Sequence, residues 1–156
     1  MPAPLNIGTE KALQKIRRYC AYQERSHREV KEKLYGFGLY KNQVDEILSL
    51  LIADNYCNEE RYAQLFAGGK FRVKDWGRNR IAYALKQQQV SAYCIKKALA
   101  SIEEDAYREK LNKLFRKKWT SLKTEGNQMV RKKKTRDYLI GKGYENGLIQ
   151  ELLSNI

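Results

Sequence analysis

The chain has 156 residues, of which 31 are Lys or Arg and 18 are Asp or Glu, giving a net charge of +13 and a pI near 9.7. Its most apolar run, residues 47–53, is far shorter than the ~20 residues that span a bilayer, and no secretory signal is recognisable, so we expect a cytoplasmic protein. Three widely spaced cysteines and one histidine support neither a disulfide framework nor a zinc site, and no cofactor is expected. Cys20 and Cys94 are predicted to pack in the core.

Helix-start signals recur along the chain. Thr9 is a candidate N-cap, Ser26 with Glu29 forms a capping box, and Asn58 and Ser91 are candidate caps further on. Apolar residues recur at spacings of three and four rather than two, so no segment is predicted to be a strand. The expected helices cover residues 9–25, 26–36, 44–52, 58–73, 78–88, 91–101, 103–123 and 127–140, with a last one after Gly143.

One pattern occurs three times. Each copy has a leucine anchor, and the anchors are Leu34, Leu85 and Leu139. Four residues after the anchors stand Gly38, Gln89 and Gly143; ten residues after them stand Val44, Ile95 and Ile149; four residues before them stand Val30, Ile81 and Thr135. Self-similarity at a near-constant period predicts an all-α protein of three tandem three-helix repeats, about nine helices in an elongated, curved modular array. The alternative, a chance match of common Leu and Ile positions, stays open here.

The predicted units are a leader over residues 1–8 and repeats over 9–56, 57–102 and 103–156. Gln89 replaces the turn glycine of the other copies, so we expect a different turn there. Gly68-Gly69 falls within a predicted helix, where it indicates either a bend or the close approach of another backbone.

Positive charge is concentrated in the second and third predicted repeats. The three repeats, with the leader counted in the first, carry net charges of +2, +6 and +5. A cationic surface of this size attracts nucleic acid, anionic membrane or an acidic protein. The candidate contact residues are Lys70, Arg72, Lys74, Trp76, Arg78, Arg80, Lys86, Arg116, Lys117, Lys118, Arg131, Lys132, Lys133 and Lys134. Trp76 could stack on a partner or pack a core edge, and the run 131–134 could equally be a solvated helix face.

The passage from Tyr56 to Ala63, followed by Trp76-Gly77-Arg78-Asn79-Arg80-Ile81 and Leu85, resembles the RecX family, bacterial regulators of the RecA recombinase. Arg61-Tyr62-Ala63, Gly77, Arg80-Ile81 and Leu85 carry the resemblance, whereas Cys57, Glu59, Gln89 and Gly68-Gly69 depart from the family pattern. The resemblance implies a protein that binds RecA filaments on single-stranded DNA and modulates, usually inhibits, their ATPase, strand-exchange and coprotease activities. It would thereby regulate recombination and DNA repair.

Two other functional classes remain. A stand-alone, weakly specific nucleic-acid-binding protein could use helix-turn-helix-like units, although the helices after the turns offer few cationic side chains. An enzyme is not expected, because the sequence has no paired carboxylates on an apolar background and no phosphate-binding loop after a strand. Repeats with unlike terminal units predict a monomer.

Overall fold

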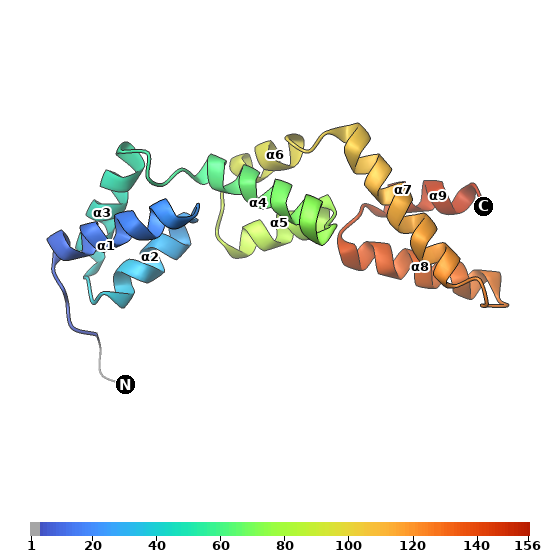
Figure 1. Cartoon of the computed structure of the whole chain (residues 1–156), viewed down its shortest axis with the longest axis horizontal. Coiled ribbons are helices and arrows are strands. Elements are labelled where there is room, and N and C mark those ends of the chain that lie inside the picture. The colour runs from blue at the N-terminus through green and yellow to red at the C-terminus, as the bar shows by residue number, and fades with distance from the viewer. Residues whose placement is uncertain (1–3) are drawn as a thin grey trace. The chain divides into compact units, whose positions relative to one another are not determined.

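The structure, a computed structural model, describes residues 4–156. In this range it contains nine α-helices and no strand, which confirms the predicted all-α class (Figure 1). The helices are α1 (Thr9–Tyr22), α2 (His27–Gly36), α3 (Lys41–Ala53), α4 (Glu59–Lys74), α5 (Arg78–Gln87), α6 (Ala92–Ala100), α7 (Glu104–Ser121), α8 (Gln128–Lys142) and α9 (Asn146–Ser154). Within residues 4–156, no helix is both long and apolar enough to cross a bilayer.

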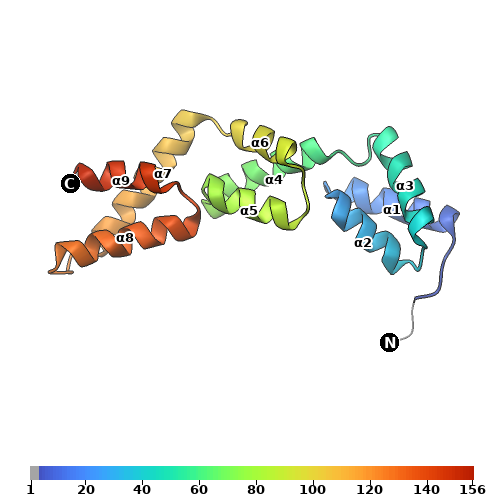
Figure 2. The same cartoon turned by 180° about the vertical axis from the view of Figure 1, so that it is seen from behind.

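Contacts between residues divide the chain into two compact units. Unit 1 comprises the residues up to Leu65 together with Leu85–Ile95, and unit 2 comprises Phe66–Ala84 together with Lys96–Ile156. Helices α1, α2 and α3 belong wholly to unit 1, whereas α7, α8 and α9 belong wholly to unit 2 and pack together there (Figure 2). The boundaries given above for the leader and the three repeats stay predictions, and residues 1–3 of that leader lie outside the described residues.

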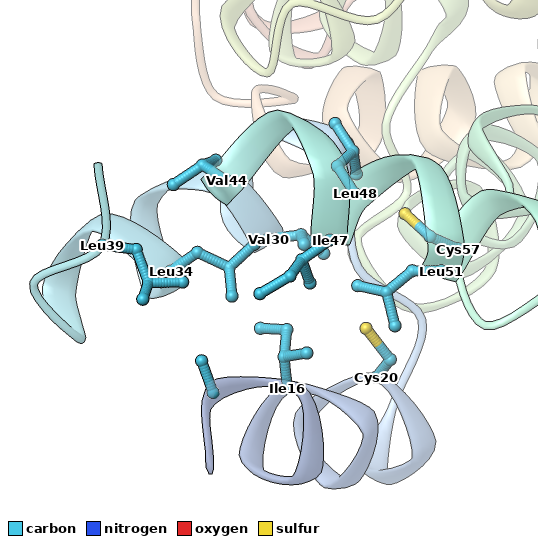
Figure 3. Packing of buried hydrophobic residues seen from close by; sticks show 11 residues of the cluster. Ile16, Cys20, Val30, Leu34, Leu39, Val44, Ile47, Leu48, Leu51 and Cys57 are labelled. Atoms are coloured by element: carbon cyan, nitrogen blue, oxygen red, sulfur yellow. The ribbon is translucent and has the colours of Figure 1, made fainter. Parts of the chain in front are cut away.

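The core of unit 1 forms between its first three helices. Figure 3 shows Ile16 and Cys20 of α1 pointing toward Ile47 and Leu51 of α3, with Val30 of α2 beside them. All five side chains are buried. Cys57 and Cys94 are buried as well, and all three cysteines are free. The prediction that Cys20 and Cys94 pack in the core is therefore confirmed.

The positions shared by the three repeats face the interior. The anchors are fully buried, as are the residues four positions before them, including Thr135, whose hydroxyl donates to the Arg131 carbonyl at 2.9 Å. The residues ten positions after the anchors are buried too. All nine matched positions lie inside, and residues 4–156 form the nine helices that the repeat predicts. The helical repeat is thus confirmed.

Three of the four predicted helix caps are present. Ser26 and Glu29 form the reciprocal capping box at the start of α2, the Asn58 side chain accepts from Arg61 N at 2.9 Å, and the Ser91 hydroxyl accepts from Cys94 N at 3.2 Å. The Thr9 cap is wrong. Thr9 is already helical and Gly8, with φ 86°, occupies the cap position, because Asn6 turns the chain by accepting from Gly8 N at 2.8 Å.

The expectation of a different turn at Gln89 is also wrong. Gln89 has φ 60° and takes the same left-handed conformation as Gly38 and Gly143. Val90 N donates to the Leu85 carbonyl at 3.1 Å, as Tyr144 N does to the Leu139 carbonyl. These hydrogen bonds close the turn. They hold Gln89 in the left-handed conformation although its Cβ makes that conformation strained.

Replacing Gln89 by glycine should therefore raise the free energy of unfolding by about 0.5–1 kcal/mol, because glycine adopts the left-handed conformation without a Cβ penalty. Urea denaturation followed by circular dichroism measures the change. The matched control is Gln87→Gly, at the last helical residue of α5, which should lower stability by about 0.5–1 kcal/mol. A loss in both variants would show that Gln89 is unstrained.

Among the described residues, no other backbone segment comes close to the glycine pair Gly68-Gly69 of α4. A Cβ on Gly68 would lie 2.8 Å from a guanidinium nitrogen of Arg72, so the space over Gly68 is filled by a side chain of the same helix. No such atom lies within 4 Å of a Cβ built on Gly69. The close-approach alternative is therefore wrong, and Gly68 instead lets Arg72 lie flat along α4.

Candidate cationic interface

The positive charge is concentrated in one unit. Unit 2 contains twenty Lys and Arg and nine Asp and Glu, a net charge of +11, whereas unit 1 has a net charge of +2. Of the predicted contact residues, only Lys86 lies in unit 1. The rest lie on α4, α5, α7 and α8 and on the connection between α4 and α5.

A contact between two glycine backbones fixes the start of α5. Gly77 N donates to the Lys142 carbonyl at 2.7 Å, and Asn79 N donates to the Gly143 carbonyl at 2.9 Å. A Cβ on Gly77 would lie 2.5 Å from the carbonyl carbon and oxygen of Gly143, a separation that no side chain could occupy. The first turn of α5 therefore rests directly on the α8–α9 turn, and this contact sets where Arg80 projects.

Arg78 is satisfied within unit 2. Its guanidinium bonds the carboxylates of Glu104 and Glu145, the latter at 2.7 Å, and lies 3.8 Å from the centre of the Tyr107 ring. Burial alone would disfavour the charged form, but the bonds to Glu145 and Glu104 outweigh it and raise the pKa of Arg78. The Tyr107 hydroxyl accepts from Arg78 N at 3.0 Å and donates to Glu145. Because its guanidinium bonds partners within unit 2, we interpret Arg78 as a structural residue.

Trp76 lies at the centre of a second arrangement, which we call the Trp76 cluster: Phe66, Lys70, Trp76 and Arg80. The Phe66 ring meets the Trp76 ring edge-on at 6.5 Å. The Lys70 ammonium lies 5.0 Å and the Arg80 guanidinium 4.4 Å from the Trp76 ring centre, and Arg80 also donates to the Gly141 carbonyl at 3.2 Å. The packing favours the core-edge interpretation of Trp76 over stacking on a partner. The ring holds two cations in place, and Arg80 stays exposed to solvent.

Beside this cluster, α4 ends in three cationic side chains. Arg72 and Lys74 are exposed, and Lys70 is half-buried in the cluster. Lys110 of α7 donates to the carbonyls of Phe71 and Arg72 at 2.8 and 3.2 Å, so a lysine from another helix occupies the negative end of the α4 dipole. Lys110 was not among the predicted contact residues, because no spacing in the chain indicates that α7 crosses the end of α4.

The second predicted set, on α7 and α8, divides into packed and exposed members. Arg131 lies 3.8 Å from the Trp119 ring centre and donates to the Trp119 carbonyl at 2.7 Å. Lys118 lies 4.9 Å from the Tyr138 ring centre. Arg116 and Lys117 are exposed. In this set the structure leaves Arg116 and Lys117 most accessible to an external anion.

The other three lysines of the basic run on α8 lie beside carboxylates or line a cavity. Lys133 lies 3.5 Å from Asp137, and Lys134 lies 3.4 Å from Glu125. Exposed pairs of this kind contribute little to stability and can exchange partners at low cost. Lys132 lines a cavity between α8 and α9. The run therefore points to several faces of the helix, as its spacing indicates.

Two further kinds of site, a metal site and a reactive thiol, can be assessed in the described range. Among residues 4–156, no group of three or more His, Cys, Asp or Glu side chains is placed to hold a metal ion. Burial raises the pKa of the Cys57 thiol to about 12, which keeps it protonated and unreactive near neutral pH. The features that stand out are cationic side chains ordered by aromatic rings.

Comparison with known families agrees with this fold. The model described as RecX, second three-helix domain, matches residues 58–99, and the model described as RecX, third three-helix domain, matches residues 105–153. Together the two matches span more than half of the chain. The chain belongs to the RecX family. The resemblance inferred from the sequence is confirmed.

Relatives and solved structures extend the match beyond these two domains. The regulatory protein RecX of Prosthecochloris aestuarii is 29% identical over 148 residues, covering 95% of both chains. That of Clostridium perfringens is 28% identical over 136 residues, covering 84% of this chain and 63% of the relative, so the chain spans about three fifths of that protein. The crystal structure of RecX from Lactobacillus salivarius has a TM-score of 0.85 at 21% identity, covering 94% of this chain and 95% of that one.

Three buried tyrosines give this RecX-family chain a testable pH dependence. Burial raises the pKa of Tyr62 to about 12, and burial raises the pKa of Tyr107 and Tyr144 still further. Because the folded state holds these protons more tightly than the unfolded state, the stability they contribute is present below about pH 10 and is lost as the pH rises through their folded pKa values.

The free energy of unfolding should therefore fall above about pH 10, by up to about 1.4 kcal/mol per pH unit for each such tyrosine. Urea denaturation at a series of alkaline pH values measures this slope. Tyr144→Phe should make the slope shallower, whereas Tyr22→Phe, at an exposed tyrosine, should leave it unchanged. Equal slopes in both variants would contradict the assignment.

Proposed function

We propose that this chain binds RecA recombinase filaments on single-stranded DNA and lowers their ATPase, strand-exchange and coprotease activities. The observation that carries the proposal is membership of the RecX family, joined to a unit with a net charge of +11. A filament of recombinase on DNA presents both phosphates and protein carboxylates, so a cationic surface of this size suits it.

The contact set that we propose comprises exposed cationic side chains together with the half-buried Lys70 of the Trp76 cluster. On α4 and α5 it comprises Lys70, Arg72, Lys74 and Arg80. On α7 it comprises Arg116 and Lys117. Arg78 and Arg131 are not part of the contact set, because their guanidinium groups already bond partners in unit 2. Their role is to stabilise the helices that carry the contact residues.

A stand-alone nucleic-acid-binding protein is less well supported. Such a protein would read DNA with the helix after each turn. Among those helices α9 has no Lys or Arg, and the single cation of α3, Lys41, lies 3.1 Å from Asp45. Only α6 offers two, Lys96 and Lys97.

Fluorescence anisotropy of labelled single-stranded DNA distinguishes the two functions. The protein is titrated at physiological salt onto bare DNA and onto DNA coated by RecA with a slowly hydrolysed nucleotide. Saturable binding to the coated DNA only, or loss of the coat, supports the proposal. Equal binding to bare DNA that disappears with added salt would indicate a general nucleic-acid binder.

A further inference from the structure

A cavity of about 480 Å³ opens between α8 and α9 in unit 2. On α8 it is lined by Met129, Lys132, Lys133 and Arg136, which share one helix face because they are spaced by three and four residues. Leu153 of α9 lines it from the other side. The face from Met129 to Arg136 is about 10 Å long, enough to hold between one and two turns of a bound helix.

The apolar part of this α8–α9 groove is open to solvent. Leu153 is buried at its base and Val130 is half-buried, whereas the Met129 side chain is 81% exposed at the rim. A flexible thioether over an apolar base is a surface that adapts to the side chain of a bound peptide. An exposed methionine on so charged a helix has no role in the core of unit 2.

The charged part of the groove is positive. Lys133 and Arg136 share one carboxylate, that of Asp137, at 3.5 and 3.6 Å. Lys132 has no ion pair with any of residues 4–156 and lies half-buried beside the cavity. The groove therefore has more cations than the chain itself neutralises, and a partner that supplies carboxylates complements it.

Nucleic acid fits the groove less well than a peptide does. Bases bind single-strand sites by stacking on aromatic side chains, and no aromatic side chain lines this cavity. The apolar part of its lining, Met129, Val130 and Leu153, consists of aliphatic and thioether groups, which match leucine-like side chains. We propose that the α8–α9 groove binds an acidic peptide segment that inserts aliphatic side chains over Leu153 and places carboxylates on Lys132, Lys133 and Arg136. This proposal does not depend on the proposed function.

Methyl NMR tests the proposal directly. The chain has only two methionines, Met1 and Met129, so labelling methionine methyl groups gives a signal at the groove rim that Met129→Leu assigns. The probe is a peptide in which pairs of Leu alternate with Glu, and the control peptide has Ser in place of Leu at the same charge. We expect the Leu/Glu peptide to shift the Met129 resonance and to bind about tenfold more tightly than the Ser/Glu peptide.

Two variants separate the groove from general charge attraction. Lys132→Glu should weaken binding of the Leu/Glu peptide about tenfold, whereas Lys123→Glu, at an exposed lysine of the same unit, should change it less than about twofold. Equal binding of both peptides, an unmoved Met129 signal or equal loss in both variants would overturn the proposal. So would an oligo-dT that displaces the peptide and itself shifts the Met129 resonance, because the groove would then bind nucleic acid.

Discussion

Replacing Gly143 by alanine is expected to lower the free energy of unfolding by about 3–5 kcal/mol. Gly143 has φ 102°, a conformation that alanine adopts only with strain. In addition, its new Cβ would lie 2.4 Å from the Arg80 Cβ and 2.6 Å from Arg80 N. Backbone atoms of a helix cannot move aside as the end of a flexible side chain can, so the two costs combine.

Urea denaturation followed by tryptophan fluorescence measures this loss, because both tryptophans, Trp76 and Trp119, lie in unit 2. The control is Gly147→Ala in α9, where a Cβ meets nothing within 4 Å. That change should be neutral or stabilise by up to about 1 kcal/mol through helix propensity. A Gly143→Ala protein within about 1 kcal/mol of the wild type would show that the turn relaxes without cost.

The reciprocal change, Gly77→Ala, probes the other side of the same contact. Because the Cβ of either variant disrupts one shared interface, the losses should not add in the double variant. Additive losses would mean that the two glycines act separately.

The elements of this fold could be predicted because their signals are local. Ser26 with Glu29 caps α2 through residues three positions apart, and the leucine anchors mark the buried face because helices repeat apolar positions at three and four. Gln89 shows the limit of such signals. Its identity argues against a left-handed turn, but the hydrogen bond from Val90 N to the Leu85 carbonyl imposes one.

The candidate site could be predicted only in part, because a sequence gives charges without their partners. Arg78 and Arg80 are equivalent in a count of cations. In the structure Arg78 bonds Glu145, 67 positions away, whereas Arg80 lies exposed against Trp76. The contact between Gly77 and Gly143 links positions equally remote along the chain. Only the tertiary fold separates the cations that hold unit 2 together from those left for a partner.

Reversing Arg72, Lys74 and Arg80 to Glu together is expected to weaken binding to RecA-coated single-stranded DNA by at least about 100-fold. The three residues are exposed, so their charges act outward, and the change removes six units of positive charge from one region of unit 2. Anisotropy with the coated DNA measures the loss. Circular dichroism checks that the helices persist in the triple variant.

The matched control reverses Lys11, Arg18 and Lys31, three exposed cations of unit 1, and changes the net charge equally. If the partner recognises the end of α4 and the start of α5, this control should keep binding within about threefold of the wild type. Equal loss in both variants would mean that overall charge attracts the protein to the filament. The salt dependence of binding then distinguishes contacts to DNA phosphates from contacts to protein carboxylates. Loss of direct phosphate contacts flattens the slope of log affinity against log salt, whereas loss of contacts to carboxylates changes this slope less.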